Sequence, residues 1–252
     1  MTDVTVELGD DHVATVRFSR PPDNFFDVAL IGDLSDAYEQ LDTDDACRAI
    51  LLCSDGRHFC AGANFAPGGA GTGGPALYDE AVRMFATGKP VVAAVQGAAV
   101  GGGLGLALSA DMRVAGPGSR FVANFARLGI HQGFGLSVTL PAAVGQQRAL
   151  DLLYTGRRVK GDEALALGLC DRLADSDDAI HADAHALAAE IALSAPLAVR
   201  SIRQTLRGDL AERVRAATLR EGSEQAWQLG TEDFKEGVAA MSERRAPRFA
   251  GR

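Results

Sequence analysis

The stretch VVAAVQGAAVGGGLGLALSADMRVA, residues 91–115, decides the fold of this chain. Its first five residues are all apolar and predict a buried strand, and residues 112–115 predict a second one. The glycines between them favour a tight turn that opens a buried helix near Gly101. This order of strand, glycine turn, helix and strand is typical of a layered α/β core.

The same stretch has to be distinguished from a membrane span. Residues 91–110 carry no formal charge, and 20 such residues are enough to cross a bilayer. Five glycines and Gln96 interrupt the run, and Lys89 and Asp111 bound it. We therefore interpret these residues as buried core and expect no membrane partner.

Alternating and periodic apolar residues extend the pattern through the rest of the core. Residues 4–8 and 14–18 alternate as half-buried strands do, residues 30–41 repeat at helical spacing, and residues 49–53 (AILLC) form another buried strand. Together these elements predict an α/β fold for residues 1–195.

Strand signals stop after this point, and residues 196–252 are predicted to be helical. Three helical stretches follow one another, at residues 197–206, 210–229 and 232–245. Thr231 stands where the last of them needs an N-cap. Terminal helices with apolar faces pack on the core or on a neighbouring subunit, so we expect one of these two arrangements here.

The composition excludes several classes of function. A net charge of −8 without a basic stripe argues against a nucleic-acid partner, because nothing could neutralise a row of phosphates. Four cysteines without CxxC spacing indicate reduced structural thiols, and the acidic N-terminus does not have the pattern of a targeting peptide. With 47% hydrophobic and 23% charged residues, we expect an ordinary globular protein of the cytoplasm.

A second segment of small residues, FCAGANF at 59–65, precedes the first. It runs into a glycine-rich stretch, residues 61–80, that is expected to form a mobile loop. Both small-residue segments can bring backbone close to a ligand with little side chain in the way. The G-x-G-x-x-G fingerprint of dinucleotide sites fails, because it would need glycine at Leu104 or Leu106.

Six segments occur in an order that characterises a known family. They are RPPDN (20–24), HFCAGANF (58–65), KPVVAAVQGAAVGGGLGLALSADMRVA (89–115), FARLGIHQGFG (125–135), VKGDEALALGLCDRL (159–173) and TEDFKEGVAAMSERRAPRF (231–249). In these segments the chain resembles the crotonase (enoyl-CoA hydratase/isomerase) superfamily over essentially its whole length. The resemblance implies a repeated ββα spiral core, a C-terminal helical oligomerisation region that forms a homotrimer or a dimer of trimers, and an acyl-CoA substrate. No cofactor is implied besides the coenzyme A that the substrate carries.

The resemblance also assigns an oxyanion hole. In the family, two backbone N–H groups hold the thioester oxygen, and on this sequence they belong to Ala63 and Gly102. Preorganised donors in a dry site stabilise the charge that develops on such an oxygen. Gly102 would add the N-terminus of a helix.

The catalytic carboxylates of the family are missing from the matching positions. Hydratases of the family use two glutamates, and here Gly105 and Phe125 stand in their places, so neither can exchange a proton. The aspartate nucleophile of the related dehalogenases would fall at Gly133, and the aspartate of the AGAD motif is Asn64. Conventional hydration therefore lacks its acid and base.

The remaining candidates for proton transfer or metal binding are few. His131 is a speculative acid or base near the predicted site, although a histidine hydrogen-bonded in a turn is the simpler interpretation. Asp79 and Glu80 could fold over an acyl chain or form the charged face of a helix. His181 and His185 are four residues apart but lack the HExxH pattern, so we predict a surface pair and no metal.

The resemblance also implies which residues form the walls of the coenzyme A site. The predicted substrate-binding residues are Asn24, Phe25, Phe26, Ala61, Asn64, Gly105, Phe125, Met241 and Arg245. Met241 takes the place of an aromatic residue that relatives often carry in the last helix. Arginines suit the phosphates of the ligand, and the candidates are Arg20, Arg244, Arg245 and Arg248.

These residues leave three functional hypotheses. The first is an enoyl-CoA hydratase/isomerase-like enzyme of the lyase or isomerase class, which activates a thioester but has weak or no hydratase activity. The second is a hydrolase or carbon–carbon lyase that acts on a CoA ester. The third is a non-catalytic acyl-CoA-binding protein.

Overall fold

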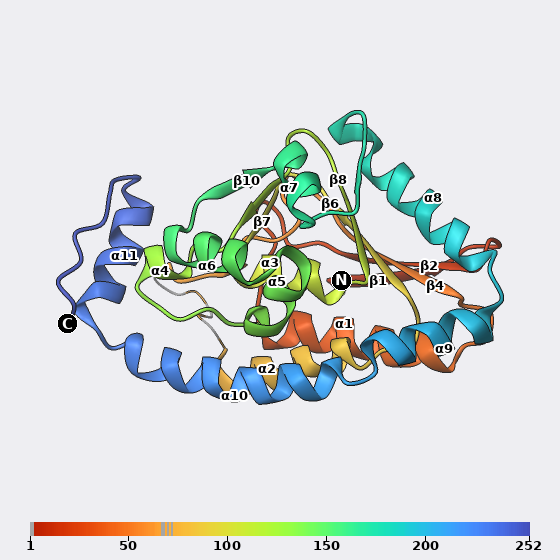
Figure 1. Cartoon of the computed structure of the whole chain (residues 1–252), viewed down its shortest axis with the longest axis horizontal. Coiled ribbons are helices and arrows are strands. Elements are labelled where there is room, and N and C mark those ends of the chain that lie inside the picture. Colours follow the sequence, from red (N-terminus) through yellow and green to blue (C-terminus); the bar gives the residue numbers. More distant parts are fainter. Residues whose placement is uncertain (1–2, 67–68, 70, 72) are drawn as a thin grey trace.

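The computed structural model describes residues 3–66, 69, 71 and 73–252, and its centre is a six-stranded sheet (Figure 1). The strands lie in the order β1 (Val4–Leu8), β2 (Val13–Phe18), β4 (Ala49–Ser54), β6 (Val91–Val95), β8 (Met112–Ala115) and β11 (Arg172–Leu173). β1 runs antiparallel to β2, and the other neighbours are parallel. The predicted interior strands are thereby confirmed.

Two smaller sheets lie beside the large one. One has the order β10 (Arg158–Lys160), β9 (Arg120–Val122) and β7 (Ala98–Val100), and the other pairs β3 (Phe25–Phe26) with β5 (Gly62–Ala63). The chain passes from β6 to β7 and then into helix α3 (Gly102–Ser109), and from β8 to β9 and then into α4 (Phe125–Leu128). Each of these turns of the chain adds one strand to the large sheet, one strand to a smaller sheet and then a helix, which is the repeated ββα arrangement predicted for the fold.

Helices cover both faces of the large sheet. The remaining helices of the core are α1 (Val28–Thr43), α2 (Gly74–Phe85), α5 (Leu136–Val144), α6 (Gln146–Thr155), α7 (Gly161–Leu167) and α8 (Ile180–Ala192), with a short 3₁₀ turn at Asp177–Ala179. Ile50 and Leu52 of β4 face the larger apolar core, whereas Leu51 and Cys53 face a second core beneath α8. The strand is buried on both faces, and this explains its unbroken apolar sequence.

The C-terminal helices α9 (Pro196–Arg207), α10 (Leu210–Gln228) and α11 (Glu232–Ser242) fold back onto the core of the same chain (Figure 1). α10 packs along α2 and α5, and α11 packs on α4. Glu221 of α10 is fully buried and accepts hydrogen bonds from the N–H groups of Gly135 and Ser137, both 2.9 Å long. Of the two arrangements predicted for this region, α10 and α11 show packing on the core of the same chain, whereas no residue of α9 is buried within the described chain.

The uncharged run at residues 91–110 belongs to the core, as predicted, because it is divided among β6, β7 and α3. In the described part of the chain no single helix is long and apolar enough to cross a membrane. One pair of helical segments, Asp177–Ala192 and Pro196–Gln228, is long and apolar enough when the two are taken together, but they are bent by 105° relative to each other.

Within the two small-residue segments, the structure differs from the sequence-based expectations in two details. β7 was not predicted, because its three residues lie within the glycine-rich turn. The expected mobile loop at residues 61–80 contains β5 and most of α2, and four of its residues, 67, 68, 70 and 72, lie outside the described residues. The presence of β5 and α2 does not test whether this segment is mobile.

Candidate functional site

The two small-residue segments meet at the edge of a cavity of about 730 Å³. Its walls come from β3, β5 and the residues that follow it, the turn before α3, α4, the segment after α4, and helices α2, α10 and α11. Of the predicted site residues, eight line this cavity: Phe25, Phe26, Ala61, Ala63, Asn64, Gly102, Phe125 and Met241. Residues far apart in the sequence are thus gathered as the motif pattern predicted.

Glycine is required where the two segments touch. Gly62 has φ +83°, and a Cβ on it would lie 2.5 Å from the Val100 carbonyl oxygen and 3.3 Å from the Gly102 nitrogen. Because only glycine adopts this backbone at such close range, β5 can approach the start of α3. The approach brings Ala63, the residue after Gly62, beside Gly102 in the cavity wall.

The Gly102 N–H is an available hydrogen-bond donor. Gly102 is the first residue of α3, so its N–H has no acceptor within the helix, and none is found elsewhere among the described residues. A Cβ on Gly102 would meet the Phe26 ring at 2.4 Å, so glycine also lets this ring pack on the turn. The donor therefore lies at a helix N-terminus with an aromatic ring beside it.

Most of the cavity wall is apolar. Phe25, Phe26, Phe125 and Phe134 contribute aromatic rings, and aliphatic side chains come from α2, α10 and α11. On one side the ring of Phe65 packs edge-on against Phe234 of α11, with centroids 5.3 Å apart. α11 thereby closes a wall against the segment that carries Ala63, and a closed apolar wall strengthens any electrostatic interaction inside.

Several polar side chains in the wall already have partners in the described chain. The Tyr78 hydroxyl donates to Gln225 Oε1 at 2.7 Å, and Gln225 Nε2 donates to the His131 carbonyl at 2.8 Å. Burial is the main cause that raises the pKa of Tyr78 far above its usual value, so the hydroxyl stays protonated. The one carboxylate of the described lining, Glu243, pairs with Arg245 at 2.6 Å.

The structure explains why no carboxylate fits at Gly105. A Cβ on Gly105 would lie 2.7 Å from Cβ of Phe134, which is buried and has a left-handed backbone with φ 59°. Phe134 therefore occupies the space that a longer side chain at Gly105 would need, and Gly105 itself does not line the described cavity.

Asn24 and His131 are placed differently from their predicted roles. Asn24 is fully buried, and its Nδ2 donates to the carbonyls of Asp55 and His58, both at 2.7 Å, so it fixes the chain before β5. His131 lies outside the described lining, and its Nδ1 is 2.8 Å from the Gln132 carbonyl oxygen. An acid or base role for His131 has no support from this geometry.

Of the other histidine and acidic candidates, Asp79 is exposed, and His181, His185 and Glu80 are half-buried. His185 is 3.4 Å from Asp11, and Glu80 pairs with Arg83 on its own helix at 2.5 Å. Burial lowers the pKa of His181, which favours the neutral ring. Within residues 3–66, 69, 71 and 73–252, no three His, Cys, Asp or Glu side chains are grouped as a metal site needs.

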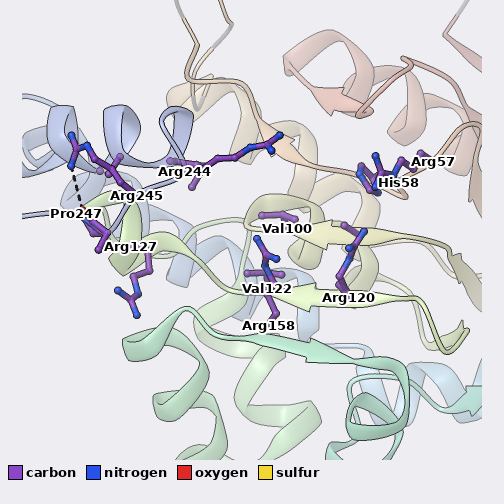
Figure 2. Close-up of a pocket in the computed structure, with 15 residues that line it drawn as sticks. Arg57, His58, Val100, Arg120, Val122, Arg127, Arg158, Arg244, Arg245 and Pro247 are labelled. Atoms are coloured by element: carbon purple, nitrogen blue, oxygen red, sulfur yellow. Dashed lines mark hydrogen bonds between the residues drawn. The ribbon is translucent and has the colours of Figure 1, made fainter.

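The arginines predicted to meet phosphates lie in three places. Arg20 pairs with Asp3 at 2.6 Å and with Asp27 at 2.8 Å, so its charge is already neutralised. Arg244 and Arg245 line a second cavity (Figure 2), which shares Val100 and Met241 with the first. Arg248 lines a separate surface hollow with Arg245 and with acidic residues of α11.

Sequence reasoning missed several residues of the site. Tyr78 and Leu77 fell in the expected loop, Gln225 lies in a helix whose polar residues carry no motif, and Phe134 is flanked by glycines. The apolar spacing of α2 was the one available signal, because Leu77, Ala81 and Met84 are buried on one side of that helix.

Three comparisons with known proteins point to one family. The sequence profile of the enoyl-CoA hydratase/isomerase family matches residues 9–252. A probable enoyl-CoA hydratase of Bacillus subtilis is 32% identical over 249 residues, which cover 96% of each chain. A 1,2-epoxyphenylacetyl-CoA isomerase of Escherichia coli is 30% identical over 251 residues, or 95% of each chain. The crystal structure of an enoyl-CoA hydratase/isomerase from Pseudoalteromonas atlantica has a TM-score of 0.88 and 36% identity, over 99% of this chain and 100% of that one.

Proposed function

Because the chain belongs to the enoyl-CoA hydratase/isomerase family, we propose that it binds an acyl-CoA thioester in the cavity between β5 and α3. The N–H groups of Ala63 and Gly102 hold the thioester oxygen and stabilise its charge in an enolate or a tetrahedral intermediate. The observation that carries the proposal is the Gly102 N–H at the start of α3, which has no acceptor among the described residues and lies beside Ala63 in one mostly apolar cavity.

The chemistry of the wall bears on which reaction follows. Gly105 and Phe125 cannot transfer protons, and Glu243 is already paired with Arg245. We therefore propose weak or no conventional hydratase activity. The same lining is compatible with hydrolysis or carbon–carbon cleavage of a CoA ester, and with binding of an acyl-CoA without turnover.

The remaining parts of the proposal concern the setting of the site. Phe25, Phe26, Ala61 and Asn64 form the ligand walls, with Met241 on the side of α11. We propose a homotrimer or a dimer of trimers in the cytoplasm, with coenzyme A supplied by the substrate and no further cofactor. Light scattering of the purified protein tests the oligomeric state.

The test of the oxyanion role uses two substitutions at one position. Ala63→Pro removes the N–H, whereas Ala63→Gly retains it. Loss of one such donor lowers turnover on the order of 10²–10³-fold, so we expect that loss for Ala63→Pro and a change of less than about tenfold for Ala63→Gly. The assay is single-turnover conversion of a panel of CoA esters that includes crotonyl-CoA.

The outcomes separate the three functional hypotheses. Efficient hydration of crotonyl-CoA by the wild type would contradict the proposed loss of hydratase activity. If no ester turns over but Ala63→Pro weakens thioester binding, the non-catalytic alternative holds. Equal turnover and equal binding by both variants would rule out the oxyanion role of Ala63.

A further inference from the structure

The first cavity has a polar feature that the proposed oxyanion site does not use, the side-chain pair Tyr78 and Gln225. Tyr78 belongs to α2 and Gln225 to α10, and both line the cavity although both are buried. Leu77 and Leu229, which flank the pair on the same two helices, are apolar lining residues. A polar group in such a wall is costly to bury unless it forms hydrogen bonds, so its partners decide what it can bind.

The orientation of the Gln225 amide follows from its partners. The His131 carbonyl oxygen, 2.8 Å from Gln225 Nε2, can only accept a hydrogen bond, so the amide nitrogen has to face it. The amide oxygen therefore faces Tyr78 and accepts from its hydroxyl at 2.7 Å. The Phe134 backbone also hydrogen-bonds the Tyr78 oxygen. The hydroxyl proton is thus committed to Gln225.

One hydrogen-bond donor of this pair is left over. An amide nitrogen of glutamine carries two N–H groups, and the only acceptor of Gln225 Nε2 among the described residues is the His131 carbonyl. Because Gln225 is buried, an unused N–H on it carries the desolvation penalty of an unsatisfied donor. A ligand oxygen within reach of this nitrogen would remove the penalty.

Glycine at position 133 leaves room beside the pair. A Cβ on Gly133 would lie 2.2 Å from Tyr78 Oη and 2.8 Å from Gln225 Nε2, so any other residue would displace one of these groups. Gly133 also lines the cavity. The amide nitrogen therefore adjoins the open space of the cavity without a side chain in front of it.

Two aromatic rings separate the pair from the proposed oxyanion site. The Phe26 ring lies against Gly102, where an added Cβ would meet it at 2.4 Å. Phe134, the residue after Gly133, packs on Phe26 with ring centroids 5.4 Å apart. An acyl group whose thioester oxygen lies at Gly102 would have to pass both rings before it reaches Gln225. The unused donor is therefore available to the remote part of an acyl group, not to its reacting carbons.

We propose that Gln225 selects acyl-CoA ligands whose acyl group carries a hydroxyl or keto oxygen away from the thioester, and that this oxygen accepts the unused Nε2–H. Tyr78 is a positioning residue, because its hydroxyl holds the amide oxygen. The inference rests on the proposed acyl-CoA function and deepens it by naming the class of acyl group. A plain hydrocarbon chain would leave the donor unpaired, so the site should discriminate against it.

Matched ligands test this selectivity by calorimetric titration into the full-length protein. One set is linear: hexanoyl-CoA, 5-hydroxyhexanoyl-CoA and 5-oxohexanoyl-CoA. The other is flat: phenylacetyl-CoA and 4-hydroxyphenylacetyl-CoA. The wild type should bind at least one oxygen-bearing ester about tenfold more tightly than its plain counterpart, because the plain ester leaves a buried donor unpaired. Within the linear set, the hydroxyl and keto esters distinguish the two sources of the oxygen.

Three variants show whether the pair causes the preference. Gln225→Met removes the donor, so the ratio of the two affinities should fall to about one. Tyr78→Phe frees the amide to rotate and should lower the ratio by about threefold. Tyr38→Phe is the matched control and should leave the ratio unchanged, because Tyr38 is a buried tyrosine of α1 outside the described lining. The ratio is measured within one variant, so a loss of folded protein cannot imitate the effect.

Two results would overturn the selectivity. One is equal affinity of the wild type for the plain and oxygen-bearing esters of both sets, and the other is a preference that persists unchanged in Gln225→Met. In both cases the esters still bind, so the acyl-CoA site itself would stand. If the wild type binds none of the esters, the proposed acyl-CoA function is wrong and the selectivity is wrong with it.

Discussion

The two neighbouring cavities share Val100 and Met241 but present opposite chemistry to a ligand. In the function that we propose, the first offers backbone N–H groups at β5 and α3, inside a wall that is mostly aromatic and aliphatic. The second, which we call the arginine cavity, offers guanidinium groups with permanent charge from Arg57, Arg120, Arg127, Arg158, Arg244 and Arg245. Backbone dipoles in a dry site suit charge that develops during a reaction, whereas guanidinium groups suit a ligand that is already charged.

The difference also lies in how each cavity is built. The first depends on close backbone contact, which glycine permits at Gly62 and Gly102. The second depends on side chains that project from a regular sheet surface and from the chain after α11. Substitutions should therefore damage the first through the fold and the second through charge alone.

The largest expected effect is from Gly62→Ala. The new Cβ would lie 2.5 Å from the Val100 carbonyl oxygen on a backbone with φ +83°, and we expect a loss of more than about 3 kcal/mol of unfolding free energy. Gly145→Ala is the matched control, because Gly145 has φ +80° and no atom within 4 Å of its added Cβ. With ψ 157° its backbone is one that other residues rarely adopt, so the substitution should cost about 1–3 kcal/mol without the added clash. Urea unfolding measures both, and equal losses would show that the close contact is unimportant.

The second largest expected effect is that of salt on ligand affinity, which should differ between the two cavities. Between low and physiological ionic strength, the affinity of the arginine cavity for pyrophosphate should fall by about tenfold, because interactions of exposed charges are screened. Acetyl-pantetheine, which has no phosphate, should keep its affinity in the apolar cavity. Calorimetric titrations over a salt series test this, and parallel slopes for the two ligands would remove the distinction.

The sequence predicted the first cavity better than the second, and the reason is physical. The glycine and alanine segments are continuous in sequence, so their backbone geometry is encoded locally. Arg57, Arg120 and Arg158 stand in three unrelated segments, and only the sheet pairing brings them together. No local pattern distinguishes them from solvated surface arginines.

The sequence predicted the strands β1, β2, β4, β6 and β8, the helices α1 and α3, and the three C-terminal helices, but not the short strands, α2 or the helices α4 to α8. The strand expected at VVAAV is β6, and the helices expected after residue 195 begin within one residue of α9, α10 and α11. The predicted N-cap, Thr231, accepts a hydrogen bond from the Phe234 N–H at 3.1 Å. Tertiary packing decided the rest: a short strand such as β7 is stabilised by its neighbour β9 rather than by its own residues.

A smaller effect is expected from pH at the arginine cavity. Burial, Arg57 and Arg120 hold the pKa of His58 below its usual value, while Asp23 acts in the opposite direction. A bound phosphate would raise this pKa, so the ring would take up a proton on binding. Pyrophosphate affinity should therefore increase about threefold as pH falls from about 7.5 toward the ordinary histidine pKa of about 6.5. Because pyrophosphate itself titrates, His58→Gln supplies the reference. Identical pH profiles for the two proteins would show that His58 does not face the anion.

The smallest expected effect concerns the wall of the first cavity. Phe65 and Phe234 pack edge-on at 5.3 Å, and such aromatic pairs contribute about 0.5–1.5 kcal/mol beyond their buried area. A double-mutant cycle with Phe65→Leu and Phe234→Leu should give a coupling energy in this range by urea unfolding. Additive losses would mean that α11 does not close this wall in solution.

The central claim is that Ala63 and Gly102 hold a thioester oxygen through their N–H groups, and the carbonyl stretch of bound acetyl-CoA tests it most directly. Infrared difference spectra should show a lower C=O frequency for the bound thioester than for the free one, because hydrogen bonds polarise the carbonyl. The shift should be retained in Ala63→Gly and largely lost in Ala63→Pro. A bound thioester with the frequency of the free one in the wild type would contradict the account.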